Sequence, residues 1–187
     1  MNLYRLEKFK GSIFVCGFMA SGKSTVGKEI AKKLKWDFRD LDTEIEQREG
    51  KKIRDIFNEE GEKYFREKER EYLMELSKEF RGILSLGGGA LQDQYVVDQL
   101  KMNGLLLFID APLDEIVERV YRSNNRPILF DKAGKIKSKE TLFKELKALY
   151  SARIKFYKQA QVSIKTPLFT SVDEMTEAAI EKISRYV

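Results

Sequence analysis

The chain has 187 residues, of which 42% are hydrophobic, and this fits one globular domain with a sizeable core. The longest apolar runs, ILSL at 83–86 and LLLFI at 105–109, are far too short to cross a bilayer, so no membrane partner is expected. The absence of histidine excludes imidazole bases, Ser-His triads and histidine-based zinc sites, which leaves acid–base chemistry to Asp, Glu, Lys or Tyr.

Charge and cysteine content indicate the setting in which the protein works. The net charge of +5 is spread along the chain without an arginine-rich tail, which favours a small anionic ligand over nucleic acid. The single cysteine, Cys16, lies in an apolar stretch and is predicted to be a buried thiol. Without an intramolecular disulfide or a recognisable secretory signal, we expect a cytoplasmic protein, and we expect it to be a monomer.

Short apolar segments alternate with amphipathic segments along the chain. The first of them, SIFVC at 12–16, predicts a buried strand, and apolar side chains four residues apart in 21–34 predict a helix after it. The other predicted strands are 36–42, 83–86, 105–109 and 161–165. The other predicted helices are short ones broken at Gly50 and Gly61, then 62–80, one around 96–100, one with Pro112 just inside its start, 139–160 and 171–187.

This alternation predicts an α/β fold, a three-layer α/β/α sandwich around a five-stranded parallel sheet. Crossovers between its strands should be right-handed. Ligands of such sheets bind beyond the carboxyl ends of the strands. The segments 17–25, 40–42 and 87–89 all fall at those ends.

The segment GFMASGKST at 17–25 matches the phosphate-binding pattern G-x-x-x-x-G-K-S/T, with a strand before it and a helix after it. Its glycines let successive backbone N–H groups point at phosphate oxygens, and the helix N-terminus adds its dipole. Lys23 would reach the β- and γ-phosphates, and Ser24 would ligate Mg²⁺. The chain is therefore predicted to have a P-loop NTPase fold. The predicted nucleotide-binding residues here are Gly17, Ala20, Ser21, Gly22, Lys23, Ser24 and Thr25.

Three classes of nucleotide-using protein share this loop. A GTPase should carry N-K-x-D, which is absent, and the D-x-x-G at 131–134 lies in a hydrophilic loop. An ATPase motor should have a metal-binding acid at the end of an apolar strand, and Asp110 is a candidate, although we favour its interpretation as a helix cap. A small-molecule kinase needs an acceptor-binding acid, acceptor clamps and a lid that excludes water.

Candidates for all three kinase features occur. Asp40 and Asp42 end a predicted strand, where residues two apart share a face; one could hold Mg²⁺ through water and the other could bind the acceptor hydroxyl. A helix cap remains an alternative for this pair. The glycines at 87–89 would let a substrate approach main-chain N–H groups, or would simply form a tight turn. In the loop 123–138, predicted to be long and mobile, Arg126 precedes a proline and could act as a lid arginine or be a solvated side chain.

Beyond these single motifs, nearly the whole chain resembles the shikimate kinases. The resemblance is carried by GFMASGKSTVGKEIAKKL, FRDLDTEIEQREGKKIRDIFNEEGEKYFREKE, ILSLGGGA, NNRPIL and SARIKFYKQA, which occur in the family's order. It implies ATP-dependent phosphorylation of the 3-hydroxyl of shikimate, a step toward aromatic amino acids. It also implies a single kinase domain over 1–187, with the phosphate-binding segment at 11–25, a substrate-binding region at about 40–80 and a lid at about 123–138.

The resemblance assigns roles residue by residue. It implies that Lys23 binds phosphate, that Ser24 and Asp40 serve Mg²⁺, and that Asp42 binds the shikimate hydroxyl as the candidate base. The clamp of the substrate carboxylate would be Arg66 and Arg153, two guanidinium forks that suit a carboxylate. The remaining implied contacts are Gly88 and Gly89 in the shikimate pocket beside Gly87, Arg126 in the lid, and Arg119 beside the adenine, with Arg122 one turn away as its alternative.

Two departures from the family pattern fall in the lid region, so the shape of the lid does not follow from the resemblance. The interval from Arg126 to Arg153 is longer than in the family, because FDKAGKIKSKE enlarges this region, and NNRP replaces a more usual Gly or Asp before the Arg-Pro pair. Roles for Lys135 and Lys137 therefore stay open. The alternatives are a related kinase of another small acceptor, such as gluconate or a nucleoside monophosphate, and a non-catalytic ATP-binding protein, which would need no acceptor clamp.

Overall fold

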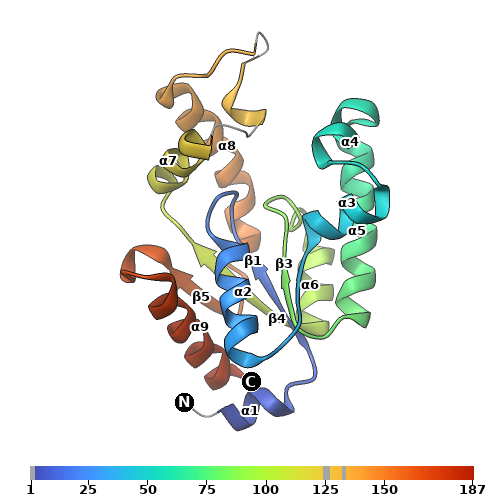
Figure 1. Ribbon diagram of the computed structural model, residues 1–187, viewed down its shortest axis with the longest axis vertical. Helices are drawn as coiled ribbons and strands as arrows, with labels where there is room; N and C mark the ends of the chain where they lie inside the picture. The colour runs from blue at the N-terminus through green and yellow to red at the C-terminus, as the bar shows by residue number, and fades with distance from the viewer. Residues whose placement is uncertain (1–2, 124–126, 132–133) are drawn as a thin grey trace.

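The computed structural model describes residues 3–123, 127–131 and 134–187. At its centre five strands form one parallel sheet, and helices cover both faces of it (Figure 1). The strands are β1 (Ser12–Cys16), β2 (Phe38–Asp40), β3 (Ile83–Ser85), β4 (Gly104–Asp110) and β5 (Val162–Lys165). Their order in the sheet is β2-β3-β1-β4-β5, so the predicted α/β/α sandwich of the P-loop type is confirmed.

At least one helix follows each strand in chain order, as the alternating pattern predicts, and one helix that was not predicted precedes β1. The helices are α1 (Leu3–Lys8), α2 (Lys23–Leu34), α3 (Leu41–Glu49), α4 (Ile53–Glu59), α5 (Gly61–Glu79), α6 (Gln94–Asn103), α7 (Leu113–Ser123), α8 (Lys139–Tyr157) and α9 (Val172–Tyr186). Two short 3₁₀ turns, η1 (Pro127–Leu129) and η2 (Thr166–Leu168), lie between them. Within the described ranges, no helix combines the length and apolar character needed to cross a membrane.

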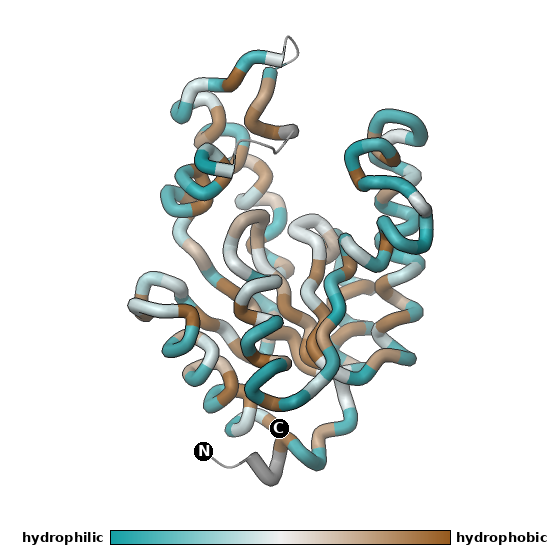
Figure 2. Tube along the Cα trace, viewed as in Figure 1, coloured by the Kyte–Doolittle hydropathy of each residue, from teal (hydrophilic) through white to brown (hydrophobic). Residues whose placement is uncertain are grey.

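Two hydrophobic clusters, one on each face of the sheet, hold the layers together. Ile13 and Val15 of β1 pack in the cluster with α2 and α9, whereas Phe14 and Cys16 pack in the cluster on the opposite face with α5, α6 and α8. This alternation is the period of two that a strand covered on both sides requires. Figure 2 shows hydrophobic residues gathered along the central strands. Cys16 is buried as predicted, and burial raises the pKa of its thiol to about 12.

The predicted strand 36–42 is shorter than expected, and its end carries a correction. The strand stops at Asp40 because that side chain accepts a hydrogen bond from the backbone N–H of Asp42 and caps α3, which begins at Leu41. Asp42 therefore lies in the first turn of a helix, and the prediction that Asp40 and Asp42 share a strand face is wrong. The alternative, a helix cap, is what the chain forms, yet both carboxylates still face one pocket.

Two other predictions differ from the structure in detail. Asp110 is the last residue of β4 and accepts a hydrogen bond from the Tyr150 hydroxyl at 3.4 Å, while α7 begins only at Leu113, so Asp110 is not the cap of that helix. Pro112 correspondingly precedes α7 instead of lying inside it.

The segment 123–138 contains more regular structure than the predicted loop. It includes η1 and a β-bridge between Phe130 and Ile136. Lys137 fastens this bridge, since its backbone N–H donates to the Leu129 carbonyl at 2.9 Å and its ammonium donates to Glu145 at 2.7 Å. Arg126, the predicted lid arginine, lies outside the described residues.

Candidate active site

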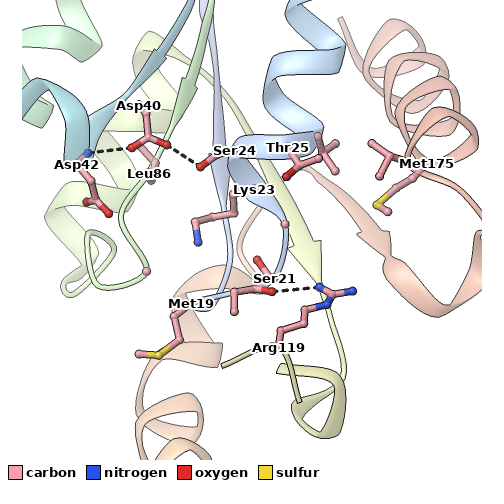
Figure 3. A pocket seen from close by; sticks show the side chains of 15 residues that line it. Met19, Ser21, Lys23, Ser24, Thr25, Asp40, Asp42, Leu86, Arg119 and Met175 are labelled. Atoms are coloured by element: carbon pink, nitrogen blue, oxygen red, sulfur yellow. Dashed lines mark hydrogen bonds between the residues drawn. The ribbon is translucent and has the colours of Figure 1, made fainter. Parts of the chain in front are cut away.

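A cavity of about 500 Å³ opens at the carboxyl ends of the strands, where the predicted phosphate-binding segment lies (Figure 3). One part of its wall is this segment, and other parts come from the start of α3, the turn after β3, α7 and the start of α9. Its lining residues are Met19, Ala20, Ser21, Gly22, Lys23, Ser24, Thr25, Val26, Asp40, Asp42, Leu86, Gly88, Arg119, Val172 and Met175.

The backbone of the phosphate-binding segment takes conformations that its glycines permit. Gly17 has φ +146° and packs so closely on β4 that a Cβ there would lie 2.6 Å from the Ile109 carbonyl oxygen. Gly22 has φ +99° directly before α2 begins at Lys23. Both positions therefore need glycine, and the chain curls over the N-terminus of α2 as the motif predicts.

Polar groups inside this curl are arranged for an anion. Lys23 is only 8% exposed, and its ammonium donates to the Phe18 carbonyl at 3.0 Å. Within the described part of the chain, the Ser21 hydroxyl is the one buried side-chain polar atom without a hydrogen-bond partner. Because a buried hydroxyl without a partner is costly, its place beside Lys23 fits a site that binds phosphate oxygens.

Three oxygen-bearing side chains meet next to Lys23. The Ser24 hydroxyl donates to Asp40 Oδ2 at 2.6 Å and lies 3.1 Å from the Ser85 hydroxyl (Figure 3 draws the first contact). Mg²⁺ prefers oxygen ligands and usually takes only one or two of them from the protein, with water and phosphate oxygens as the others. This donor set therefore fits that ion. Ser85 was not singled out from the sequence, although it ends a buried strand two residues before Gly87.

Asp42 lines this pocket, and its pKa is raised above the ordinary value for an aspartate. Burial is the largest cause that raises its pKa above the ordinary value, and the negative charge of Asp40 raises it further. Lys23 and Arg66 act in the opposite direction. A carboxylate with a raised pKa beside two cations is suited to accepting a proton.

The glycine turn at 87–89 brings the predicted acceptor residues together. A Cβ on Gly87 would lie 2.8 Å from Asp42 Oδ1 and 2.6 Å from Glu69 Oε1. A Cβ on Gly89 would lie 2.6 Å from Arg66 Nη1. The turn is therefore packed against side chains of α3 and α5, and its glycines leave room for the ends of those side chains.

Arg66 is held by a carboxylate that sequence reasoning missed. Arg66 Nη1 donates to Glu69 Oε2 at 2.6 Å, and Glu69 is only 3% exposed. The pKa of Glu69 is raised above its ordinary value, mainly by burial, although the nearby Arg66 guanidinium acts in the opposite direction. The spacing of three residues on a helix indicates such a pair, but a highly charged helix such as α5 offers many pairs of that spacing.

Arg153 approaches the same turn from α8. Its Nη1 donates to the Gly88 carbonyl at 3.0 Å, and the hydroxyl of Tyr157, one helical turn further on, donates to the same oxygen at 2.5 Å. The structure thus places Asp42, Arg66 and Arg153 around one glycine turn. Tyr157 was not predicted as a site residue, because it lies on the apolar face of its helix, where a side chain is expected to belong to the core.

At the other end of the cavity, Arg119 lies against the phosphate-binding segment. Its Nη1 donates to the Ala20 carbonyl at 3.1 Å, and its Nη2 donates to Glu115 at 2.8 Å. Of the two arginines considered for this place, Arg119 lines both the cavity and a second hollow between α7 and α8, whereas Arg122 lines the second hollow and not the cavity. Sequence reasoning missed Val172 and Met175 of α9, which also line the cavity.

Comparison with known proteins identifies the family of the chain. A family model described as shikimate kinase matches residues 19–184. The shikimate kinase of Persephonella marina is 41% identical over 155 residues, which cover 83% of this chain and 88% of that relative.

Solved structures agree with this match. A crystal structure of shikimate kinase from Bacteroides thetaiotaomicron has a TM-score of 0.83 and 31% identity, and covers 92% of this chain and 98% of its own. A shikimate kinase from Acinetobacter baumannii, in complex with shikimate, has a TM-score of 0.78 and 30% identity over 95% of this chain and 93% of its own. From its motifs, its fold and these relatives, the chain belongs to the shikimate kinase family.

Proposed function

We propose that this protein transfers the γ-phosphoryl group of ATP to the 3-hydroxyl of shikimate, a step in the synthesis of aromatic amino acids. One observation carries the proposal: an acid and two arginines, Asp42, Arg66 and Arg153, surround the glycine turn that borders the phosphate-binding cavity. A protein that only bound ATP would not need this second set of groups. A kinase needs both sets within reach of each other.

The nucleotide end is formed by the segment 17–25 and α7. The backbone N–H groups of the curl and the Lys23 ammonium bind the phosphates, and the Ser21 hydroxyl gains its missing partner there. Arg119, with Val172 and Met175 across the cavity, provides a flat charged group and apolar surface for the nucleobase.

The oxygen cluster beside Lys23 would hold Mg²⁺. Ser24 and Asp40 are its proposed ligands, with the Ser85 hydroxyl 3.1 Å from Ser24 Oγ. When bound, the ion neutralises charge on the phosphate oxygens. Asp40 also caps α3, so the same carboxylate links this ligand cluster to the helix that carries Asp42.

The acceptor end recognises shikimate by its carboxylate and its hydroxyls. Arg66 and Arg153 present planar guanidinium groups that bind a carboxylate through paired hydrogen bonds. Gly88 and Gly89 let the ring approach the backbone closely, because no Cβ stands in the way. Asp42 accepts a hydrogen bond from the 3-hydroxyl and orients its oxygen toward the phosphate end.

Most of the rate enhancement comes from position and charge. Asp42 takes the proton of the attacking hydroxyl, and its raised pKa makes it a stronger base than an ordinary aspartate. Lys23 stabilises charge on the transferring phosphoryl group. Arg126 is proposed to act beside Lys23 when the lid, about 123–138, covers the site.

The proposed working unit is a single chain with one kinase domain. Its phosphate-binding segment, 11–25, and its acceptor-binding region, 40–80, contribute to the site from the same molecule, so a monomer suffices for activity. Cys16 is a buried free thiol, which is compatible with the reducing cytoplasm that the sequence predicts.

A coupled assay of ADP release tests the function. Purified protein with ATP and Mg²⁺ should release ADP when shikimate is added, and not when gluconate or a nucleoside monophosphate replaces it. No release above background with shikimate contradicts the proposal. Isothermal titration separates the remaining alternative, because a non-catalytic protein would bind ATP in the titration yet show no turnover with any acceptor.

A further inference from the structure

The Gly88 carbonyl accepts two hydrogen bonds from one helix. Tyr157 donates at 2.5 Å and Arg153 at 3.0 Å, and both side chains come from successive turns of α8. A carbonyl oxygen has two lone pairs, so both bonds can form together. One of the two donors, Arg153, is also a proposed ligand of the substrate carboxylate.

The two donors differ in their freedom to move. Tyr157 is only 1% exposed, and its ring stacks on Phe108 with centroids 5.5 Å apart. Arg153 is half-buried and has a long, flexible side chain. Gly88 itself is confined, since a Cβ there would lie 3.0 Å from the Met19 backbone nitrogen in the phosphate-binding segment.

From this difference we propose, resting on the function above, that Tyr157 is a positioning residue for shikimate binding. Its hydroxyl keeps the Gly88 carbonyl hydrogen-bonded when the Arg153 guanidinium turns from that carbonyl to the substrate carboxylate. The carbonyl of Gly88 is part-buried, and leaving it without any donor costs free energy that would be subtracted from substrate affinity. Tyr157 removes this cost and keeps the turn in place against Met19.

The protonation of Tyr157 agrees with this role. Burial raises the pKa of its hydroxyl above the ordinary value, so the group stays protonated and remains a donor at every pH at which the protein works. The site therefore keeps one permanent donor to Gly88 and one donor that can leave.

The variant Tyr157→Phe tests the proposal, because it removes one oxygen and keeps the stacked ring. We expect the KM for shikimate to rise about tenfold. The kcat and the KM for ATP should stay within about twofold, which also reports that the variant is folded. The matched control is Tyr150→Phe on the same helix, whose hydroxyl contacts Asp110 at 3.4 Å; its KM for shikimate should stay within about twofold.

The same substitution in an Arg153→Ala background distinguishes positioning from a merely structural role. Without Arg153, loss of the Tyr157 hydroxyl leaves Gly88 unpaired both with and without substrate, so no further rise in the KM for shikimate is expected. A rise of equal size in both backgrounds, or an unchanged KM in the single variant, overturns the inference while the wild-type enzyme still turns over shikimate. A wild-type protein inactive with shikimate overturns the proposed function as well.

Discussion

The two ends of the proposed active site, one for phosphate and one for the acceptor, are built in different ways. The phosphate end is one continuous segment, 17–25, whose backbone conformation is dictated by its own residues. The acceptor end is assembled from α3, α5, the turn after β3 and α8, which contribute Asp42, Arg66, Gly88 and Arg153. The first end is therefore a local property of the chain, and the second exists only when the layers of the sandwich are packed.

The two ends also differ in the charge that they bury. The phosphate end buries a cation, Lys23, together with polar backbone groups. The acceptor end contains the buried carboxylate of Glu69 and the half-buried carboxylate of Asp42, and burial raises the pKa of both. Substitutions at the acceptor end should therefore change affinity for shikimate and folding stability together, whereas those at the phosphate end should act on the nucleotide.

Lys23→Ala should have the largest effect. It removes the buried cation of the phosphate end, and kcat should fall about 1000-fold, as for loss of a preorganised group that stabilises transition-state charge. Steady-state kinetics measure this fall. The control is Lys32→Ala on the same helix, whose side chain is 78% exposed and which should retain full activity. A kcat within tenfold of the wild type would show that the phosphate end works without this lysine.

Asp42→Ala should come next, with kcat lower by about 100-fold, the contribution expected of a general base. ATP binding, measured by titration, should be unchanged because Asp42 belongs to the acceptor end. The control is the exposed Asp98→Ala on α6. Activity that survives within about tenfold, or roughly 1.4 kcal/mol of barrier, contradicts the base role.

Arg66→Ala and Arg153→Ala should each raise the KM for shikimate about 30-fold through loss of a charged hydrogen bond, with a smaller change in kcat. Arg66→Ala should also lower the melting temperature, since it leaves the carboxylate of Glu69 buried without its partner. The matched control is Arg70→Ala, one turn along α5, where the arginine pairs with Asp93 at the surface. If the KM is unchanged in both variants, the carboxylate clamp does not exist.

The pH dependence of activity and that of stability should have opposite signs at Asp42. Its raised pKa means that activity is complete above that pKa and is lost as pH falls through it, so the acid limb of kcat should lie above about pH 4, the value for an ordinary aspartate.

Stability runs the other way, because the protonated form is favoured in the folded state and its stabilisation is lost as pH rises through the same pKa. Asp42→Asn should therefore melt at a higher temperature than the wild type at pH 7, and this difference should shrink in acid. Thermal unfolding of both proteins across pH measures it, and a lower melting temperature at pH 7 would argue that Asp42 is stabilised as an anion.

Arg119→Ala should have the smallest effect, about a threefold rise in the KM for ATP, because this arginine is part-exposed and already paired with Glu115. Arg122→Ala serves as its control, since Arg122 shares the hollow between α7 and α8 with Arg119 but does not line the cavity. A larger rise in the KM for ATP with Arg122→Ala than with Arg119→Ala would indicate that the nucleobase binds beside Arg122 instead.

The contrast between the two ends also explains what could be read from the sequence. The strand 12–16, the glycine positions and Lys23 follow from short-range patterns, because a buried strand and a phosphate-binding curl are each encoded within about ten residues. The closeness of 17–25 to 87–89 follows from the rule that ligands of a parallel sheet bind beyond the carboxyl ends of its strands.

The sequence left one local choice open, and it could not show two contacts that depend on long-range packing. Asp42 was expected on a strand, but Asp40 accepts its backbone N–H and starts a helix there, a choice between two local bonds that the spacing leaves open. Glu69 looks like one more exposed charge of α5 until α5 packs beside the glycine turn. In the sequence Tyr157 looks like an ordinary core residue. Its role could not be predicted, because the hydrogen-bond partner of its hydroxyl, Gly88, lies 69 positions away in the chain.

The most direct test of the account is a crystal structure with ADP, Mg²⁺ and shikimate bound. We expect the diphosphate inside the curl at 17–25, the shikimate carboxylate hydrogen-bonded to Arg66 and Arg153, and the 3-hydroxyl at Asp42 on the side that faces the phosphates. Shikimate bound elsewhere, or turned so that its carboxylate meets neither arginine, would contradict the account.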